Sequence, residues 1–342
     1  MKKHKICKIL LVILAIFLCV AFYELLGICV AYKKQPEVSN TTKKETKNGS
    51  WNECSENTER AVIIEKNPEA LLQRVRLIKN AKKEIILSTF AFQSDESGKL
   101  ILGALHDAAD RGVHIRLLVD GMESWIDMEG NPYFYGLSSH ENVEIKLYNK
   151  ANPLKPWKMM GRMHDKYLIA DGKRYILGGR NTYNYFLGDF PGHKNYDRDV
   201  LVVCDEPEKE NSVNQLLEYF ETIWEQEDSG YFHDNKKLAN RKSVKNAVLE
   251  LQNGYQKYFE ENKERICDTD YTDETFETEK IALVSNPIHT GSKEPVVWYQ
   301  LGELMKNAKN RVKIHTPYII CNDMMYNTWA VSYTHLRAHE TK

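Results

Sequence analysis

A histidine, a lysine and an aspartate stand in the middle of the chain at a spacing that suits phosphoryl chemistry. His164, Lys166 and Asp171 form the pattern H-x-K-x-x-x-x-D, and Gly178-Gly-Arg-Asn181 follows. Side chains two apart on an extended segment point to the same side, so His164 and Lys166 are expected to share one face of a strand. Phosphoryl transfer without a metal needs a nucleophile, a cation and neutral donors for the phosphate oxygens. His164, Lys166 and Asn181 fit these three roles.

A β-hairpin is predicted to position these residues. Asp171-Gly172 is a two-residue turn signal, and Lys173 to Leu177 is expected to return as the partner strand. Each signal alone is common, since a lone His on a strand is usually structural and an Asp-Gly pair is usually only a turn. Their joint order favours a functional site. Asp171 could close the turn, orient a catalytic group, or do both. The opposite face of the first strand is expected to carry Met163, Asp165, Tyr167 and Ile169.

Segments on both sides of the motif strengthen this interpretation. Together with H-x-K-x-x-x-x-D, they resemble the phospholipase D superfamily, and especially the bacterial cardiolipin synthase branch of the C type. The resemblance covers roughly residues 61 to 330. The segments that carry it are 80–89, Ser97-Gly98, 105–121, Gly178-Gly-Arg-Asn-Thr-Tyr-Asn-Tyr-Phe186 and Asp197-Arg-Asp-Val200.

The resemblance implies an α/β fold, a two-lobed phospholipase D-like α-β-α sandwich with the active site between the lobes. It implies that His164 forms a phosphohistidine and that a His in a second motif protonates the leaving alcohol. Lys166, Asn181 and Gly179 would bind the substrate phosphate. Asp171 would orient the site, and no metal or cofactor is implied. Two further aspartates, Asp197 and Asp199, would position neighbouring cationic groups.

An internal repeat supports two lobes without reference to the family. Leu77–Thr89 is echoed by Leu304–Thr316, an offset of 227 residues (304 minus 77). Chance similarity is the alternative, but Lys-Asn-Ala-Lys stands at the same register in both copies. The offset predicts a second catalytic histidine near position 391, beyond Lys342. The chain is therefore expected to be an incomplete enzyme that shows no transferase activity as it stands.

The first 32 residues are predicted to anchor the protein in a membrane. Four lysines in the first eight residues precede Ile9 to Tyr32, a stretch with one charge, Glu24, that exceeds the ~20 residues a bilayer requires. A cleaved signal peptide is the alternative. The lysines favour a cytoplasmic N-terminus, although Lys33 and Lys34 weaken the asymmetry. The catalytic domain is then expected on the extracytoplasmic side.

The remaining organisation follows from composition, which is typical of a globular protein with 42% hydrophobic and 28% charged residues. Ser212 to Gln226 has apolar residues at helical spacing and should pack on the first lobe. The charged stretch from Asn235 to Arg265 should form helices that cover the cleft or only connect the lobes. The chain is expected to divide into a tail and transmembrane anchor at 1–32, a polar linker at 33–60, a first lobe at 61–205, a helical connection at 206–280 and the start of a truncated second lobe at 281–330. Residues 331–342 resemble a translated sequencing adapter, and a natural polar end is the alternative.

The predicted function is that of a membrane-anchored phosphatidyltransferase whose partners are phospholipids, such as phosphatidylglycerol, and the membrane. Water as the acceptor would make it a phospholipase D-like phosphodiesterase. A nuclease is a rival interpretation, but a net charge of -1 gives no footprint for a nucleic-acid backbone, so no nucleic-acid partner is expected. A non-catalytic, membrane-anchored binding protein is the rival of a different class.

Overall fold

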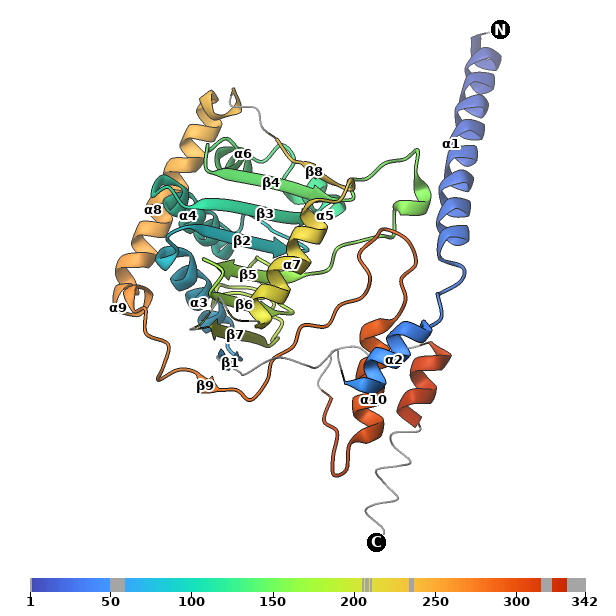
Figure 1. Ribbon diagram of the computed structural model, residues 1–342. Coiled ribbons are helices and arrows are strands. Elements are labelled where there is room, and N and C mark those ends of the chain that lie inside the picture. The colour runs from blue at the N-terminus through green and yellow to red at the C-terminus, as the bar shows by residue number, and fades with distance from the viewer. Residues whose placement is uncertain are drawn as a thin grey trace.

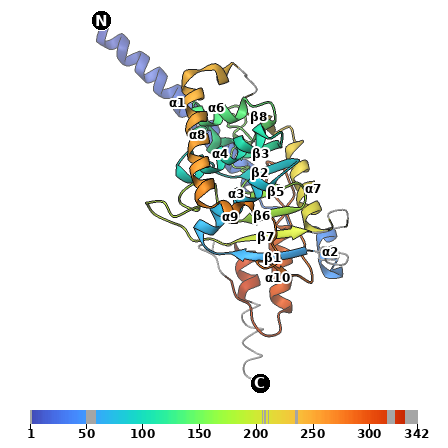
Figure 2. The same cartoon turned by 90° about the vertical axis from the view of Figure 1, so that its left-hand side faces the viewer.

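The computed structural model describes residues 2–49, 59–204, 206, 209, 211–233, 237–314 and 322–330. Within these residues, one mixed sheet of nine strands forms the centre of the molecule (Figure 1), in the order β8-β4-β3-β2-β5-β6-β7-β1-β9. Helices cover both faces of this sheet (Figure 2). The sandwich architecture expected for the first lobe is therefore confirmed.

The first half of the sheet is parallel. Strands β2 (Glu84–Thr89), β3 (His114–Asp120) and β4 (Val143–Tyr148) run in the same direction and end at the same edge. Their runs of Ile, Leu and Val are buried, as strands covered on both faces require. Helix α4 (Glu96–Asp110) connects β2 to β3, and α5 (Gly121–Asp127) and α6 (Pro132–Ser138) connect β3 to β4.

The second half of the sheet is antiparallel. It consists of β5 (Lys166–Ala170), β6 (Arg174–Gly178), β7 (Asp199–Cys204), β1 (Glu59–Ile64) and β9 (Phe276–Glu277). Strand β5 pairs antiparallel with β2, so Lys166 lies opposite Thr89, where β2 ends. Short β8 (Ser229–Tyr231) closes the other side on β4. The stretch 206–280 thus adds strands β8 and β9 besides the predicted helices.

The two faces of β5 enter two separate cores, as the alternation of its residues predicts. Met163, Tyr167 and Ile169 pack in the core under α7 (Ser212–Trp224), and Leu168 and Ala170 pack in the core on the other face. The amphipathic helix expected at 212–226 is confirmed as α7.

The larger core is covered by α3 (Asn67–Asn80), α4, α6, α8 (Lys242–Glu261) and α9 (Lys263–Cys267). A short 3-10 helix, η3 (Leu238–Asn240), precedes α8. A Cβ added to Gly103 of α4 would lie 2.7 Å from the Leu251 carbonyl oxygen of α8. This close packing places α8 against α4, and α8 also packs on α6. It therefore buries a core rather than covering the end of β5 that carries the motif (Figure 1).

At the N-terminus, α1 (Lys2–Tyr32) extends away from the sheet unit (Figure 1). Its residues Lys5–Tyr32 are long and apolar enough to cross a membrane by length and composition. The segment predicted as a polar linker contains a helix, α2 (Asn40–Asn48). Ser39 is its N-cap residue, and the Ser39 side chain accepts a hydrogen bond from the Thr42 N–H. This cap satisfies one of the amide donors that a helix start leaves unpaired.

The second copy of the internal repeat is partly formed. Its helical half forms the end of α10 (Val296–Asn307). Asn307, where α10 ends, corresponds in the repeat to Asn80, where α3 ends. Residues 308–314, which the repeat aligns with residues 81–87 at the start of β2, are irregular, because no described strand lies beside them to pair with their backbone groups. The end of the repeat at 315–316, the residues up to 321 and the adapter-like tail at 331–342 lie outside the described residues.

The hairpin between β5 and β6 is confirmed, with its return strand starting at Arg174 rather than Lys173. Asp171 and Gly172 both adopt left-handed backbone conformations, with φ of 55° and 62°. The Asp171 carboxylate accepts from the backbone N–H groups of Lys82, Lys83 and Glu84, at 2.7 to 3.1 Å. Asp171 therefore ties the turn to the start of β2.

Replacing Asp171 should destabilise the sheet at this turn. Asp171→Gly removes the carboxylate that accepts from three backbone N–H groups, but glycine adopts the left-handed conformation without strain. We expect this substitution to lower the free energy of unfolding by about 2 kcal/mol. Asp171→Asn keeps one acceptor oxygen and tolerates the same conformation, so its loss should be smaller. Chemical unfolding of the detergent-solubilised chain measures both. Equal stability of Asp171→Gly and the parent would contradict this role.

Candidate active site

The predicted site residues gather at one edge of the sheet. Strands β2, β3 and β4 end there, β5 and β7 begin there, and β6 ends there with Gly178 opposite Asp199. This edge, called here the catalytic edge, carries His164, Lys166, Asn181 and Asp197 on the segments that leave the strands. The convergence results from antiparallel pairing of β5 with β2, which brings the start of one strand beside the end of the other.

His164 lies two residues before β5 and is exposed, whereas Lys166 is buried as the first residue of the strand. The Lys166 Nζ donates to the His164 carbonyl oxygen at 2.7 Å. The Phe90 ring, just after β2, lies close to both side chains. Its centroid lies 4.7 Å from that of the His164 imidazole and 5.3 Å from the Lys166 Nζ. The two predicted groups therefore form one cluster with an aromatic support.

The electrostatic surroundings of this cluster favour a neutral imidazole. Partial desolvation of its ring by the surrounding protein lowers the pKa of His164, and the positive charge of Lys166 lowers it further, against the opposing effect of Asp120. Burial also lowers the pKa of Lys166, to about 8, although the carboxylates of Asp165 and Asp197 raise it. An unprotonated ring nitrogen is required of a nucleophile, and an ammonium is required to neutralise phosphate oxygens. The cluster provides both near neutral pH.

Asp120 fixes the segment that precedes His164. Its fully buried carboxylate accepts from the Met163 N–H at 3.0 Å and from the Arg162 Nε at 3.1 Å, with a second contact to the Arg162 guanidinium. It also accepts from the Met122 and Glu123 N–H groups at the start of α5. One carboxylate thus joins the end of β3 to the entry of β5.

Asn181 and Gly179 lie on the segment after β6. The Asn181 side-chain oxygen accepts from the Ala91 N–H at 3.3 Å, which leaves the NH2 group as the donor side of the amide. A Cβ at Gly179 would lie 2.0 Å from an Asp197 carboxylate oxygen. Gly179 is therefore needed for Asp197 to approach this segment, where the Asp197 charge acts on Lys166.

Asp199 is buried and forms ion pairs with two arginines. Its Oδ2 lies 2.9 Å from the Arg74 guanidinium and 3.2 Å from that of Arg180, and all three side chains are nearly inaccessible to solvent. Arg180 also donates to the backbone carbonyls of Ile64, Glu65 and Asp197. This network joins β1, β7 and the segment after β6, and removal of one partner would leave an unpaired buried charge.

A cavity of about 390 Å³ opens beside the cluster. His164, Asp165 and Lys166 line it together with residues 283–286 and Lys293. The Tyr219 hydroxyl of α7 donates to Asp165 at 2.8 Å, and burial raises the pKa of the Asp165 carboxyl, against the opposing charge of Lys293. The cavity can admit a phosphodiester group next to His164.

The structure separates the predicted residues into two groups. His164, Lys166, Gly179, Asn181 and Asp197 meet at the catalytic edge, with buried Asp199 just behind them. Asp171 lies at the opposite end of β5, roughly 20 Å away at the usual rise of a strand, and does not join them.

Sequence reasoning missed Asp120 and Phe90, which support the cluster from neighbouring strand ends. The available signal for Asp120 was its position between a buried apolar run and a glycine, where a parallel strand ends. Phe90 had the corresponding position after β2.

Comparisons with known proteins agree with this geometry. Residues 74–224 match the family described as cardiolipin synthase, PLD-like domain. An uncharacterized protein of Helicobacter pylori is 29% identical over 288 residues, which cover 76% of this chain and 54% of the relative. Cardiolipin synthase C of Escherichia coli is 29% identical over 171 residues, which cover 46% of this chain and 34% of that enzyme.

A solved structure shows the same fold. The phosphatidylserine synthase of Haemophilus influenzae superimposes with a TM-score of 0.54 and 16% identity, and the match covers 85% of this chain and 63% of that structure. The chain spans about a third to about half of the length of the curated relatives that it matches.

The contribution of Lys166 to the His164 pKa can be measured directly. Lys166→Met removes the positive charge, so the pKa of His164 should rise, while partial desolvation of the ring still holds it below the ordinary value of a histidine. The measurement is an NMR titration of the His164 Cε1 proton. Lys173→Met, an exposed lysine at the far end of the hairpin, is the matched control and should leave the pKa unchanged. A fall or no change with Lys166→Met would contradict the proposed environment.

Proposed function

The chain belongs to the phospholipase D superfamily, in its cardiolipin synthase-like branch, and on that premise we propose that it is a membrane-anchored phosphatidyltransferase with His164 as the nucleophile. The observation that carries the proposal is the pairing of a histidine of lowered pKa with Lys166 at an open cavity. A neutral imidazole and an adjacent ammonium are what attack on an anionic phosphodiester needs.

The reaction has two steps. A ring nitrogen of His164 attacks the phosphorus of a phospholipid such as phosphatidylglycerol, a P–N bond forms, and the P–O bond to the departing alcohol breaks. That alcohol takes a proton from a general acid. A hydroxyl of a second lipid then attacks the phosphorus of the phosphohistidine and loses its proton to the conjugate base of that general acid. The P–N bond breaks and His164 is released. Water in place of the lipid hydroxyl would give phosphodiester hydrolysis.

The neighbouring residues have separate roles in this proposal. Lys166, the Asn181 amide and the backbone at Gly179 bind phosphate oxygens. Asp197 keeps Lys166 charged, and Asp120 positions the backbone before His164. Asp171 and Asp199 act through the fold, by holding the far turn and the buried arginine pair.

The general acid is assigned by family resemblance to the histidine of a second H-x-K-x-x-x-x-D motif, which residues 1–342 do not contain. Transfer between lipids is therefore proposed for the whole protein, and the chain as it stands should lack it. The α1 segment would anchor the enzyme, with the N-terminus in the cytoplasm and the catalytic domain outside.

The nucleophilic step can be isolated with a diester whose leaving group needs no proton. With bis(p-nitrophenyl) phosphate, we expect the full chain to release about one equivalent of p-nitrophenolate in a burst, as a covalent intermediate requires. His164→Gln should abolish the burst. His140→Gln is the matched control, because His140 pairs with Asp110 before β4, at the opposite end of the strand from the catalytic edge. A burst that persists in His164→Gln, or is absent from the parent chain, would refute the assignment.

The pH dependence of that burst should have two limbs. The rate should rise with pH as His164 loses its proton, and fall as Lys166 loses its own near about 8. In Lys166→Arg the cation stays protonated, so the alkaline limb should disappear from the range in which the protein is folded. Burst rates across pH check this. An unchanged alkaline limb in Lys166→Arg would show that another group titrates there.

A further inference from the structure

Large apolar side chains are exposed on two segments that leave the catalytic edge. On α5, which follows Asp120, Trp125 and Ile126 are 68% and 67% exposed. On the connection from β4 to β5, Leu154, Trp157 and Met160 are 78%, 45% and 58% exposed. Residues 122–127 and 150–160 are called here the apolar rim. Exposed apolar patches of this kind mark contact with a partner or a membrane.

The apolar rim lies next to the helix that can cross a membrane. The Tyr23 hydroxyl of α1 donates to the Leu154 carbonyl at 3.0 Å, and a Cβ at Gly27 would lie 2.5 Å from the Pro156 side chain. Pro156 belongs to the short turn η2 (Pro156–Lys158), which Figure 1 shows beside α1. Gly27 is five residues before the end of α1 at Tyr32, or about 7.5 Å along the helix. The part of the rim at 150–160 is thus at the level of the last turns of the apolar helix.

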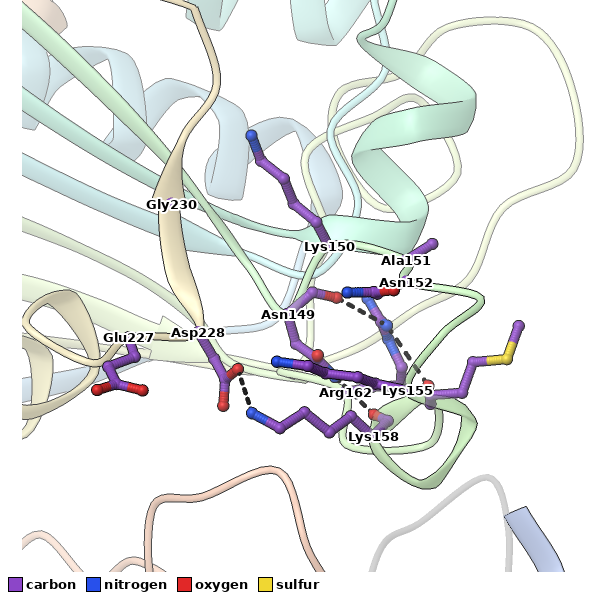
Figure 3. A pocket seen from close by; sticks show the side chains of 11 residues that line it. Asn149, Lys150, Ala151, Asn152, Lys155, Lys158, Arg162, Glu227, Asp228 and Gly230 are labelled. Carbon is purple, nitrogen blue, oxygen red and sulfur yellow. Dashed lines mark hydrogen bonds and ion pairs between the residues drawn. The ribbon is translucent and has the colours of Figure 1, made fainter. Parts of the chain in front are cut away.

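The charge beside the rim suits anionic headgroups. A pocket of about 230 Å³ is lined by Lys150, Lys155, Lys158 and Arg162 against two acidic residues, Glu227 and Asp228 (Figure 3). Lys158 pairs with Asp228 at 2.6 Å, and Lys150 donates to the Tyr231 carbonyl at 2.6 Å. Lys155, which also lines the pocket, is exposed. The balance of charge in this pocket is positive, which complements a phosphate.

We propose that the apolar rim inserts into the headgroup region of an anionic bilayer, with the lysine pocket binding a lipid phosphate beside it. Tryptophan is suited to this region because its ring is apolar while its N–H remains able to donate, and lysine stems reach across apolar surface to charged headgroups. The position of α1 supports a bilayer as the occupant over a protein partner, because the helix fixes the rim next to lipid.

Insertion would place His164 at the level of the lipid phosphates. Asp120 leads into α5, and Arg162 follows the connection and precedes His164 by two residues. Both parts of the rim are therefore joined to the cluster by short, hydrogen-bonded segments. A lipid could reach the cavity without its acyl chains leaving the membrane.

The experiment is fluorescence quenching of the full chain in bilayer nanodiscs whose acyl chains carry bromine, since bromine quenches tryptophan only at short range. In discs of brominated phosphatidylglycerol and phosphatidylcholine, Trp125→Phe/Trp157→Phe should show a clearly smaller quenched fraction than the parent. Trp224→Phe is the matched control, because Trp224 is buried in the core under α7. The fluorescence of Trp224→Phe should be quenched at least as strongly as that of the parent.

Two results would overturn the proposal. If the fluorescence of the double variant and that of Trp224→Phe are quenched to the same extent, the rim does not touch lipid, and a protein partner becomes the better occupant. If discs of phosphatidylcholine alone quench the parent as strongly as discs with phosphatidylglycerol, the pocket does not select anionic headgroups. The readout needs no turnover, so loss of the p-nitrophenolate burst would refute the catalytic proposal without affecting this one.

Discussion

The buried carboxylate of Asp120 is the interaction on which the catalytic edge depends. It accepts from backbone N–H groups at the start of α5 and at Met163, and from the Arg162 side chain. A fully buried charge is tolerated only when such donors surround it, because its desolvation costs several kcal/mol. The same donors are held in place by that charge. The entry to His164, the start of α5 and the end of β3 are therefore fixed together.

The change from parallel to antiparallel pairing at β2 and β5 explains how one short motif serves two places. His164 and Lys166 stand where β5 begins, and Asp171 stands where it has ended, so the spacing of the motif equals the length of the strand. At one edge the motif supplies a nucleophile and a cation. At the other, Asp171 binds the backbone that begins β2. The two ends of the motif thus clamp β5 against the strand beside it.

The sequence predicted the elements that depend on local residue chemistry and on the spacing of apolar residues along the chain. The hairpin, the two faces of β5, helix α7 and the apolar N-terminal helix are all present, because each is specified by residues near one another in the chain. It could not predict contacts between distant segments. Asp120 lies 43 positions before Met163, and Arg74 lies 125 positions before Asp199 (199 minus 74), so only the folded sheet shows these pairs. The role of Asp171 stayed open for the same reason, since its partners lie before β2.

A lipid phosphate stays at a nearly fixed depth, because its acyl chains remain in the hydrocarbon and its headgroup in water. An enzyme that attacks this phosphorus must bring its nucleophile to that depth or draw the lipid out, and the second course exposes apolar chains to water at about 0.8 kcal/mol per CH2 group. The catalytic edge is suited to the first course. Its connecting segments carry the exposed apolar side chains, and one of them contacts α1. The same strand ends that align His164 with Lys166 would then also set the height of the site above the bilayer.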